Sequence, residues 1–236
     1  MLILGIDTST SAIGVGLCDG QQVLGSAHRI EARGHTEHLA PLVAGLLADT
    51  GVTPRQLTDI VVGTGPGPFT GLRVGMVTGL TMGHALDLPV HGLCSLDVLA
   101  HEALCDGCAD GRPDHHYRTH EEALVATDAR RKEVYWARYR VGNGPDGTPA
   151  LVRLTDPAVD RPAELADDVR SLPTAGRGPV LYPDLFPHAL EPLDVDAGLL
   201  ALLGAQGVAA GRPMPVEPLY LRRPDALTTA ERGAAS

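Results

Sequence analysis

The chain has 236 residues, 44% of them apolar, which is enough to bury the core of one large domain or two small ones. Its formal charge is −10 at pH 7, and aromatic residues make up only 3%. Affinity for phosphate backbones comes mostly from Lys and Arg, and unpaired bases need aromatic platforms. The composition therefore disfavours a protein whose main task is to bind nucleic acid on its own.

The N-terminus and the cysteines bear on location. Asp7 follows the first apolar run too early for a signal peptide. The longest weakly polar stretch, 197–211, is shorter than the roughly 20 residues that span a bilayer. Four cysteines are too few for a disulfide scaffold in a chain of this size. We therefore expect a cytoplasmic protein that does not associate with membranes.

The first hundred residues predict an α/β unit. Residues 2–6, 13–17 and 22–28 read as strands, and the Asp19-Gly20 turn makes them an antiparallel meander. The remaining elements follow in order: a helix over 36–50, a strand over 60–63, a loop over 63–70, a helix that Thr70 caps and that ends near 86, a strand over 89–93, and a helix over 95–104.

A polar stretch divides the chain. Residues 105–122 read as a surface insertion between an N-terminal lobe, 1–104, and a smaller C-terminal lobe, 123–236. The second lobe opens as the first does, with an apolar strand that ends in Asp128, a polar turn and an alternating strand. This similarity suggests two related α/β lobes.

The turn after the first strand is a candidate phosphate loop. An Asp at a strand end followed by hydroxyl residues, as in Asp7, Thr8 and Ser9, can hold a hydrated Mg²⁺ and face a phosphate. The alternative is a turn closed by its own side-chain hydrogen bonds. The glycine-rich loop 63–71, with Arg73 beyond it, similarly reads either as an anion site or as a stiff turn.

Four glycines recur at every fourth position of the second predicted helix. The stripe of Gly71, Gly75, Gly79 and Gly83 would let another element approach closely. That element is either the lobe's own sheet or a helix of a partner subunit. For the second case the candidate contacts are Leu39, Val43, Leu46, Val74, Thr78 and Met82.

The insertion carries residue types that bind zinc, although their spacing matches no zinc-finger pattern. The candidate ligands are Cys105, Cys108, His115 and His120. We expect a surface loop without a metal and keep zinc as the alternative. The sequence contains no recognisable nucleophile motif.

Five ordered blocks resemble the TsaB (YeaZ-type) family. They are Leu4-Gly-Ile-Asp-Thr-Ser-Thr10, Gly65-Pro-Gly-Pro-Phe-Thr-Gly-Leu-Arg-Val-Gly75, Cys94-Ser-Leu-Asp97, Asp128-Ala-Arg-Arg-Lys-Glu-Val-Tyr135 and Pro218-Leu-Tyr-Leu-Arg222. The resemblance implies an actin-like ATPase (ASKHA) fold of two ribonuclease-H-like lobes with mixed sheets. It also implies a non-catalytic dimerisation subunit that supports threonylcarbamoyladenosine synthesis in tRNA.

The resemblance further implies the partners. They are a TsaD-type catalytic subunit, a TsaE-type ATPase subunit and, for the isolated chain, a second copy; tRNA is contacted only indirectly. The paired helices would be those at 36–50 and 71–86, which favours the cross-subunit reading of the glycine stripe. The metal-binding His-x3-His pair of the catalytic paralogue falls near Ser95 and Leu99, which cannot replace it.

A second class of function remains open: the chain could be an ATP-dependent phosphotransferase or ATPase that acts through Asp7 and Asp128. For the scaffold no cofactor is required. ATP or ADP would then occupy a vestigial loop at Asp7, Thr8 and Ser9.

Overall fold

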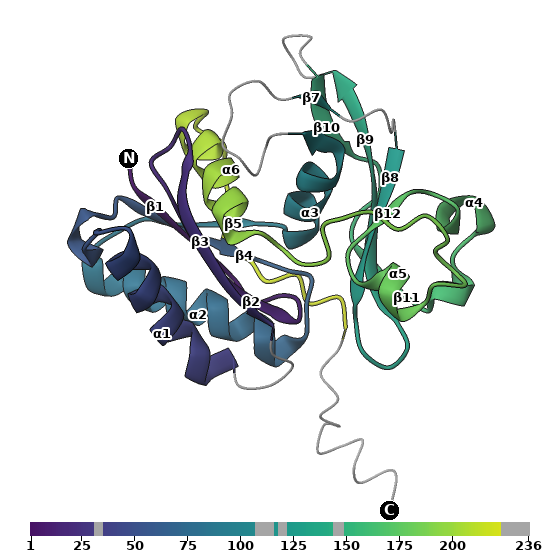
Figure 1. Ribbon diagram of the computed structural model, residues 1–236, viewed down its shortest axis with the longest axis horizontal. Coiled ribbons are helices and arrows are strands. Elements are labelled where there is room, and N and C mark those ends of the chain that lie inside the picture. The colour runs from purple at the N-terminus through teal and green to yellow at the C-terminus, as the bar shows by residue number, and fades with distance from the viewer. Residues whose placement is uncertain (31–34, 107–115, 118–121, 144–148, 223–236) are drawn as a thin grey trace, which may run out of the picture.

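The computed structural model describes residues 1–30, 35–106, 116–117, 122–143 and 149–222. They form two adjoining lobes, each built on its own sheet (Figure 1). None of the helices in these ranges is long and apolar enough to cross a membrane.

The first lobe contains a mixed sheet of five strands in the order β3-β2-β1-β4-β5. Strands β1 and β2 and strands β2 and β3 pair antiparallel, whereas β1, β4 and β5 run parallel. The predicted meander and both later strands are thereby confirmed. The bounds are β1 (Ile3–Asp7), β2 (Ala12–Cys18), β3 (Val23–Ile30), β4 (Asp59–Gly63) and β5 (Val90–Leu93).

Helices cover both faces of this sheet. On one face α1 (His35–Asp49) and α2 (Phe69–Leu86) pack against Leu4 and Ile6, with the short η1 (Pro54–Gln56) between them in sequence. On the other face α3 (Ser95–Leu104) and α6 (Ala197–Ala209) pack against Ile3. Successive strand residues point to opposite faces, so the alternation along β1 serves two cores.

Helix α6 corrects the predicted lobe boundary. The sequence assigns all of residues 123–236 to the second lobe, but α6 contacts β1, β2 and β4 of the first sheet (Figure 1). Gly5 and Gly16 permit this approach, since a Cβ on either would come within 2.2 Å of the α6 backbone. The first lobe is therefore completed by a helix from near the C-terminus.

The second lobe is built on a smaller mixed sheet in the order β10-β9-β8-β12, with β11 paired to β9. Its core gathers Leu124, Val134 and Phe186. The elements are β8 (Glu122–Asp128), β9 (Val134–Asn143), β10 (Pro149–Arg153), β11 (Ala158–Asp160), η2 (Pro162–Glu164), α4 (Asp167–Arg170), β12 (Thr174–Ala175) and α5 (Gly178–Leu181). Two short strands, β6 (Cys105–Asp106) and β7 (His116–Tyr117), pair with each other in the insertion.

The matched hairpins predicted from the sequence are present. Asp7 pairs with Gly14 at the end of β1, and Asp128 pairs with Val134 at the end of β8. Each of these two strands also has a parallel neighbour on its other side, β4 for β1 and β12 for β8.

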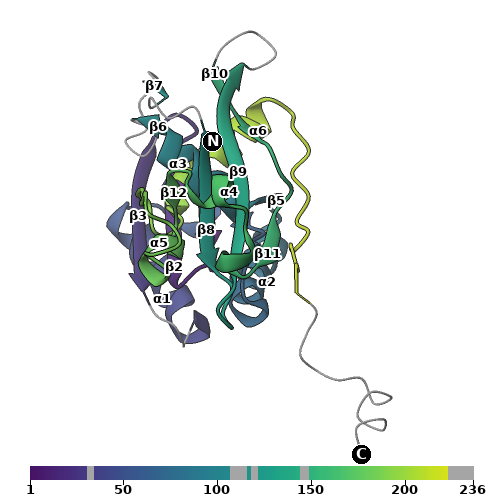
Figure 2. The same ribbon diagram turned by 90° about the vertical axis from the view of Figure 1, so that its right-hand side faces the viewer.

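The chain after α6 runs back along the first lobe. The Gly92 N–H donates to the Met214 carbonyl at 3.0 Å, and the Leu219 N–H donates to the Thr64 carbonyl at 2.9 Å. Figure 2 shows this segment in yellow beside β5. It ends at the junction of the lobes, where the Arg222 Nη1 donates to the Ala129 carbonyl at 2.9 Å.

Candidate functional site

Asp7 lies at the carboxyl end of β1 and is 1% exposed. Its Oδ1 accepts hydrogen bonds from the backbone N–H and the hydroxyl of Ser9, both at 2.8 Å. Its Oδ2 accepts from the Ser95 hydroxyl at 2.6 Å. Burial raises the pKa of Asp7, and these hydrogen bonds lower it in part. Both carboxylate oxygens are thus hydrogen-bonded to other residues of the same chain.

Neighbouring residues close the space around the loop. A Cβ at Gly63 would lie 1.8 Å from Asp7 Oδ2, and one at Gly67 would lie 2.5 Å from the Ser9 carbonyl oxygen. The Thr8 hydroxyl donates to the Gly71 carbonyl at 2.7 Å and accepts from the Gly75 N–H at 2.9 Å. Thr8 and Ser9 are 1% and 2% exposed. Asp7, Thr8 and Ser9 therefore join β1 to α2 and α3.

Two further positions bear on catalysis. Ser95 and Leu99, which fall near the metal-binding pair of the catalytic paralogue, both lie on α3. Ser95 is bonded to Asp7, and Leu99 is fully buried in the core between α3, α6 and the sheets. Neither side chain carries a nitrogen or carboxylate that binds metal.

The glycine stripe of α2 faces the chain's own sheet. A Cβ at Gly79 would lie 2.3 Å from Val62 Cγ1, and one at Gly83 would lie 2.3 Å from Val90 Cγ2. Gly71 and Gly75 contact Thr8 through the hydrogen bonds given above. The reading that presented this stripe to a partner is corrected: the missing side chains let α2 approach β4, β5 and the Asp7 loop.

The same correction applies to α1. Leu39, Val43 and Leu46, predicted as partner contacts, are 1%, 6% and 4% exposed and pack into the core beneath α1. Met82 is half-buried against that core. Val74 and Thr78 are different, since both line a groove at the surface of the helix pair.

That groove has a volume of about 340 Å³ and is mostly apolar. Its walls come from the start of α1 and from the outer side of α2: Thr36, Phe69, Thr70, Arg73, Val74, Val77 and Thr78. Phe69, Val77 and the adjoining Leu80 are 45%, 51% and 45% exposed. Large apolar side chains thus lie in solvent on the face of α2 opposite its glycines.

The sequence analysis missed Phe69, Val77 and Leu80, although helical spacing contains the signal. Positions 69, 73, 77 and 80 recur at intervals of four and three, so they share a face. Positions 69, 73 and 77 each precede a glycine by two residues, which places them about 200° from it around the helix, and position 80 shares their face because 11 residues make about three turns. Once the glycines are assigned to the sheet, this second stripe must face outward.

The zinc candidates fall largely outside the described residues. Cys108, His115 and His120 lie there, and Cys105 belongs to a disulfide, which removes its thiolate from metal binding. Among the residues that the structure describes, no three His, Cys, Asp or Glu side chains gather closely enough to hold a metal ion.

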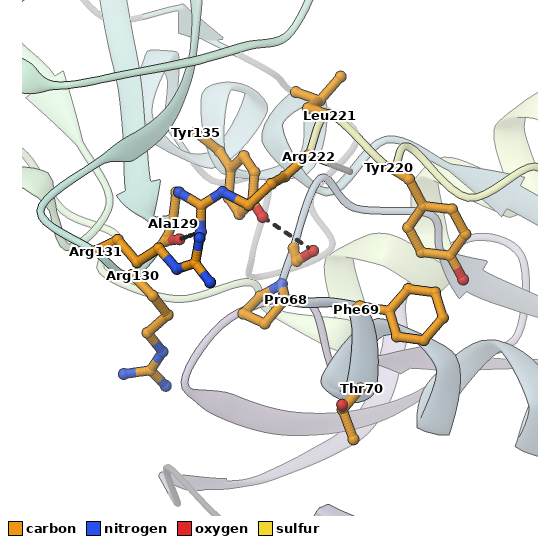
Figure 3. A pocket seen from close by; sticks show the side chains of 11 residues that line it. Pro68, Phe69, Thr70, Ala129, Arg130, Arg131, Tyr135, Tyr220, Leu221 and Arg222 are labelled. Atoms are coloured by element: carbon orange, nitrogen blue, oxygen red, sulfur yellow. Dashed lines mark hydrogen bonds between the residues drawn. The ribbon is translucent and has the colours of Figure 1, made fainter. Parts of the chain in front are cut away.

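A second cleft lies at the junction of the lobes and has a volume of about 330 Å³ (Figure 3). One wall is the loop before α2 together with its first turn, and the other is the β8–β9 turn together with the C-terminal segment. Its lining comprises Gly67, Pro68, Phe69, Thr70, Ala129, Arg130, Arg131, Tyr135, Tyr220, Leu221 and Arg222. The Tyr135 hydroxyl crosses between the walls and donates to the Gly67 carbonyl at 3.3 Å.

Comparison with known proteins shows which family this chain is similar to. Residues 25–170 match the family model of TsaD, the tRNA N6-adenosine threonylcarbamoyltransferase. An uncharacterized protein of Mycobacterium leprae is 42% identical over 95% of this chain. The tRNA threonylcarbamoyladenosine biosynthesis protein TsaB of Bacillus subtilis is 34% identical over 61% of it. The matches cover 56% and 57% of those two relatives, so the chain spans little more than half of their length.

A solved structure matches this chain in fold and over nearly its whole length. YeaZ from Pseudomonas aeruginosa superimposes with a TM-score of 0.72 at 29% sequence identity, covering 93% of this chain and all of that one. The two mixed sheets with their helices therefore form the α/β architecture of the actin-like fold, as predicted.

Proposed function

The chain belongs to the TsaB (YeaZ-type) family of tRNA threonylcarbamoyladenosine biosynthesis proteins, and we propose that it is the non-catalytic scaffold subunit of the transferase. In this role it binds a TsaD-type catalytic subunit, which transfers the threonylcarbamoyl group to the adenosine beside the tRNA anticodon. The setting is the cytoplasm. The observation that carries this proposal is the exposed apolar face of α2 beside the groove.

The exposed face has the chemistry of a docking surface for a helix pair. Phe69, Val77 and Leu80 expose large apolar side chains, and burying such side chains on association is favourable. Arg73 lies 5.0 Å above the Phe69 ring, so a cation–π contact holds the ring at one end of the face. A catalytic subunit of related fold can present its corresponding helices to this face.

We propose two further partners. In the absence of the catalytic subunit, a second copy of the chain would cover the apolar side chains and form a homodimer. A TsaE-type ATPase subunit would join the heterodimer afterwards, at a surface that pairing creates. Contacts to tRNA would be made mainly by the partners, in keeping with the net charge of −10.

A non-catalytic role also agrees with the buried loop at Asp7. Oδ1 of Asp7 accepts hydrogen bonds from Ser9 and Oδ2 accepts one from Ser95, and the Thr8 hydroxyl donates to the Gly71 carbonyl in α2. A phosphotransferase that acts through Asp7 would have to break these bonds to admit a metal ion and a phosphate. We therefore place the chemistry on the partner.

Co-purification tests the proposal. The chain is expressed with the TsaD-type subunit of the same genome, either unchanged or with Val77→Glu. We expect Val77→Glu to remove the catalytic subunit from the purified complex, because the buried charge would lack a partner. Val180→Glu is the matched control, since Val180 is 58% exposed on α5 of the other lobe.

The outcome that contradicts the proposal is equally plain. A folded Val77→Glu variant that retains the catalytic subunit in normal amount would exclude this face as the docking surface. Turnover of ATP by the purified chain alone would instead favour the phosphotransferase reading.

A further inference from the structure

A third cavity, of about 290 Å³, is lined by residues of α3, α6, β9 and β10. Figure 1 shows α3 between α6 and the second sheet. The cavity shares no lining residue with the cleft of Figure 3 or with the groove on α2. Its described lining carries one carboxylate, that of Asp97, and two guanidinium groups, those of Arg153 and Arg212. The cavity thus offers both signs of charge within a small space.

Asp97, in the first turn of α3, is held at this cavity by two neighbours. The fully buried Tyr139 donates its hydroxyl hydrogen to Oδ1 at 2.8 Å. Arg153 Nη1 lies 3.1 Å from Oδ1 but 3.4 Å from Oδ2. Most N–H···O bonds span about 2.7 to 3.2 Å, so Oδ2 has one long contact and retains the capacity to accept a better donor.

The environment of Asp97 favours such a donor. Partial burial raises the pKa of its carboxyl group, and Arg153 and Tyr139 lower it in part. A cationic donor at Oδ2 would stabilise the ionised carboxylate further. The side chains of Asp97 and Arg153 are 41% and 36% exposed, so a ligand can reach them from solvent.

Arg212 supplies the opposite charge. It lies just beyond α6, where its backbone N–H donates to the Gly207 carbonyl at 2.9 Å. Arg212 is exposed, and no carboxylate among the residues that the structure describes pairs with its guanidinium group. Guanidinium groups bind carboxylates through two parallel hydrogen bonds. Arg212 is therefore available to an anionic group that enters the cavity.

The remaining wall is apolar. Leu93, Leu151 and Leu203 line the cavity, are half-buried and pack against the core around α3 and α6. Val98, also in the lining, is fully buried. Covering the exposed parts of the three leucines with an apolar ligand group would be favourable.

From this arrangement we propose that the cavity binds a free α-amino acid with an apolar side chain. Its ammonium group donates to Oδ2 of Asp97, its carboxylate binds Arg212, and its side chain packs against the leucines. A phosphate would be repelled by the Asp97 carboxylate, and a fatty acid would bring no donor to Oδ2. A volume of about 290 Å³ suits a ligand of this size. The site is separate from the docking face of the proposed function.

Calorimetry on the purified chain tests the site with L-leucine and three analogues, at about pH 6.5, where an α-amino group is protonated. We expect L-leucine to bind at one site per chain. Leucinamide lacks the carboxylate, 4-methylpentanoate lacks the ammonium group, and glycine lacks the side chain. Each should bind about tenfold more weakly or worse, since one of the three contacts is lost. D-Leucine should also bind more weakly, because three fixed contacts distinguish the enantiomers.

Two variants assign the charged contacts. Arg212→Gln should weaken L-leucine by about tenfold and leave leucinamide unchanged, because only leucine carries the carboxylate. Asp97→Asn should weaken L-leucine and leucinamide but not 4-methylpentanoate. Arg140→Gln is the matched control: Arg140 is exposed on β9 outside the lining, and its loss should leave the affinity for L-leucine within about twofold. Thermal melting checks that each variant remains folded.

Several results would overturn the proposal. Absence of L-leucine binding at millimolar concentration would do so, as would equal affinity of Arg212→Gln and the unchanged chain, or equal affinity for the two enantiomers of leucine. Binding of 4-methylpentanoate as tight as that of L-leucine would replace the amino acid by a simple carboxylate. No partner subunit is needed and no variant lies on α2, so failure here leaves the docking proposal untouched.

Discussion

The Ser95 hydroxyl donates a 2.6 Å hydrogen bond to Oδ2 of Asp7, across 88 residues of sequence. It joins the first residue of α3 to the end of β1. The same hydroxyl accepts from the Gly65 N–H at 3.2 Å, which adds the loop before α2 to the junction. The Ser95 hydroxyl thus links β1, α3 and the loop before α2.

Removal of this hydroxyl should destabilise the fold. We expect Ser95→Ala to lower the free energy of unfolding by about 1.5 to 3 kcal/mol, because a buried carboxylate oxygen loses its donor. Urea denaturation measures the change. Ser171→Ala is the control, since the Ser171 hydroxyl makes an exposed bond to the Asp168 carbonyl and its loss should cost less than about 0.5 kcal/mol.

The titration of Asp7 is a separate prediction. Burial raises its folded-state pKa above 3.8, so the folded chain retains a proton that the unfolded chain has already released. The resulting contribution to stability is fully present below pH 3.8 and is lost as the pH rises through the folded pKa. Carbon-13 NMR of the carboxyl group measures this pKa. In Ser95→Ala it should rise further, and a pKa below 3.8 in the unchanged chain would contradict the account.

Two glycines in neighbouring helices should respond in opposite ways to the same substitution. Gly79→Ala places a methyl group 2.3 Å from Val62 Cγ1 and should destabilise the chain by about 1 to 3 kcal/mol. At Gly45 in α1, an added Cβ would have nothing within 4 Å, so Gly45→Ala should stabilise by about 0.5 to 1 kcal/mol. Thermal melts of the pair measure the difference. Equal effects would show that α2 does not approach its sheet as closely as described.

The two cysteines that are free among the described residues, Cys18 and Cys94, should be slow to react. Burial raises the pKa of Cys94 to about 12 and that of Cys18 to about 11, so little thiolate exists at pH 8. In the folded chain we expect iodoacetamide to modify both at least about tenfold more slowly than in denaturant. Peptide mass spectrometry resolves the two sites, and rapid labelling of Cys94 in the folded chain would contradict its raised pKa.

The exposed face of α2 predicts the behaviour of the isolated chain. We expect a dimer at micromolar concentration and a dissociation constant raised by about tenfold or more in Leu80→Glu, because the charge would be buried between copies. Sedimentation equilibrium measures the mass. Leu181→Glu, at a residue 46% exposed in the second lobe, should leave the dimer intact.

The sequence predicts the strands and helices of the first lobe well, because β1, β2 and β4 are buried apolar runs separated by turn residues. It does not settle which way the glycines of α2 face, since a stripe of small residues allows the close approach of the lobe's own sheet and of a partner helix equally. The start of α2 shows a related limit: the sequence predicts Thr70 as the cap, but the helix begins at Phe69.

Other features depend on residues far apart in the chain. Arg131 and Arg222 line one cleft although 91 positions separate them, and no local pattern connects them. Helix α6 is apolar on nearly all sides, so its sequence predicts burial without indicating which sheet it covers.

The return of α6 to the first sheet has a consequence for synthesis on the ribosome. When residue 104 has emerged from the ribosome, the residues of β1, β2 and β4 have all been synthesised. Helix α6, which packs on one face of these strands, begins only about 90 residues later. A nascent chain stalled anywhere between these points exposes that apolar face, including the backbone beside Gly5 and Gly16. The first lobe is thus the earliest part to be translated and among the last to be completed, so part of its apolar surface stays uncovered for longer during synthesis than its position in the sequence suggests.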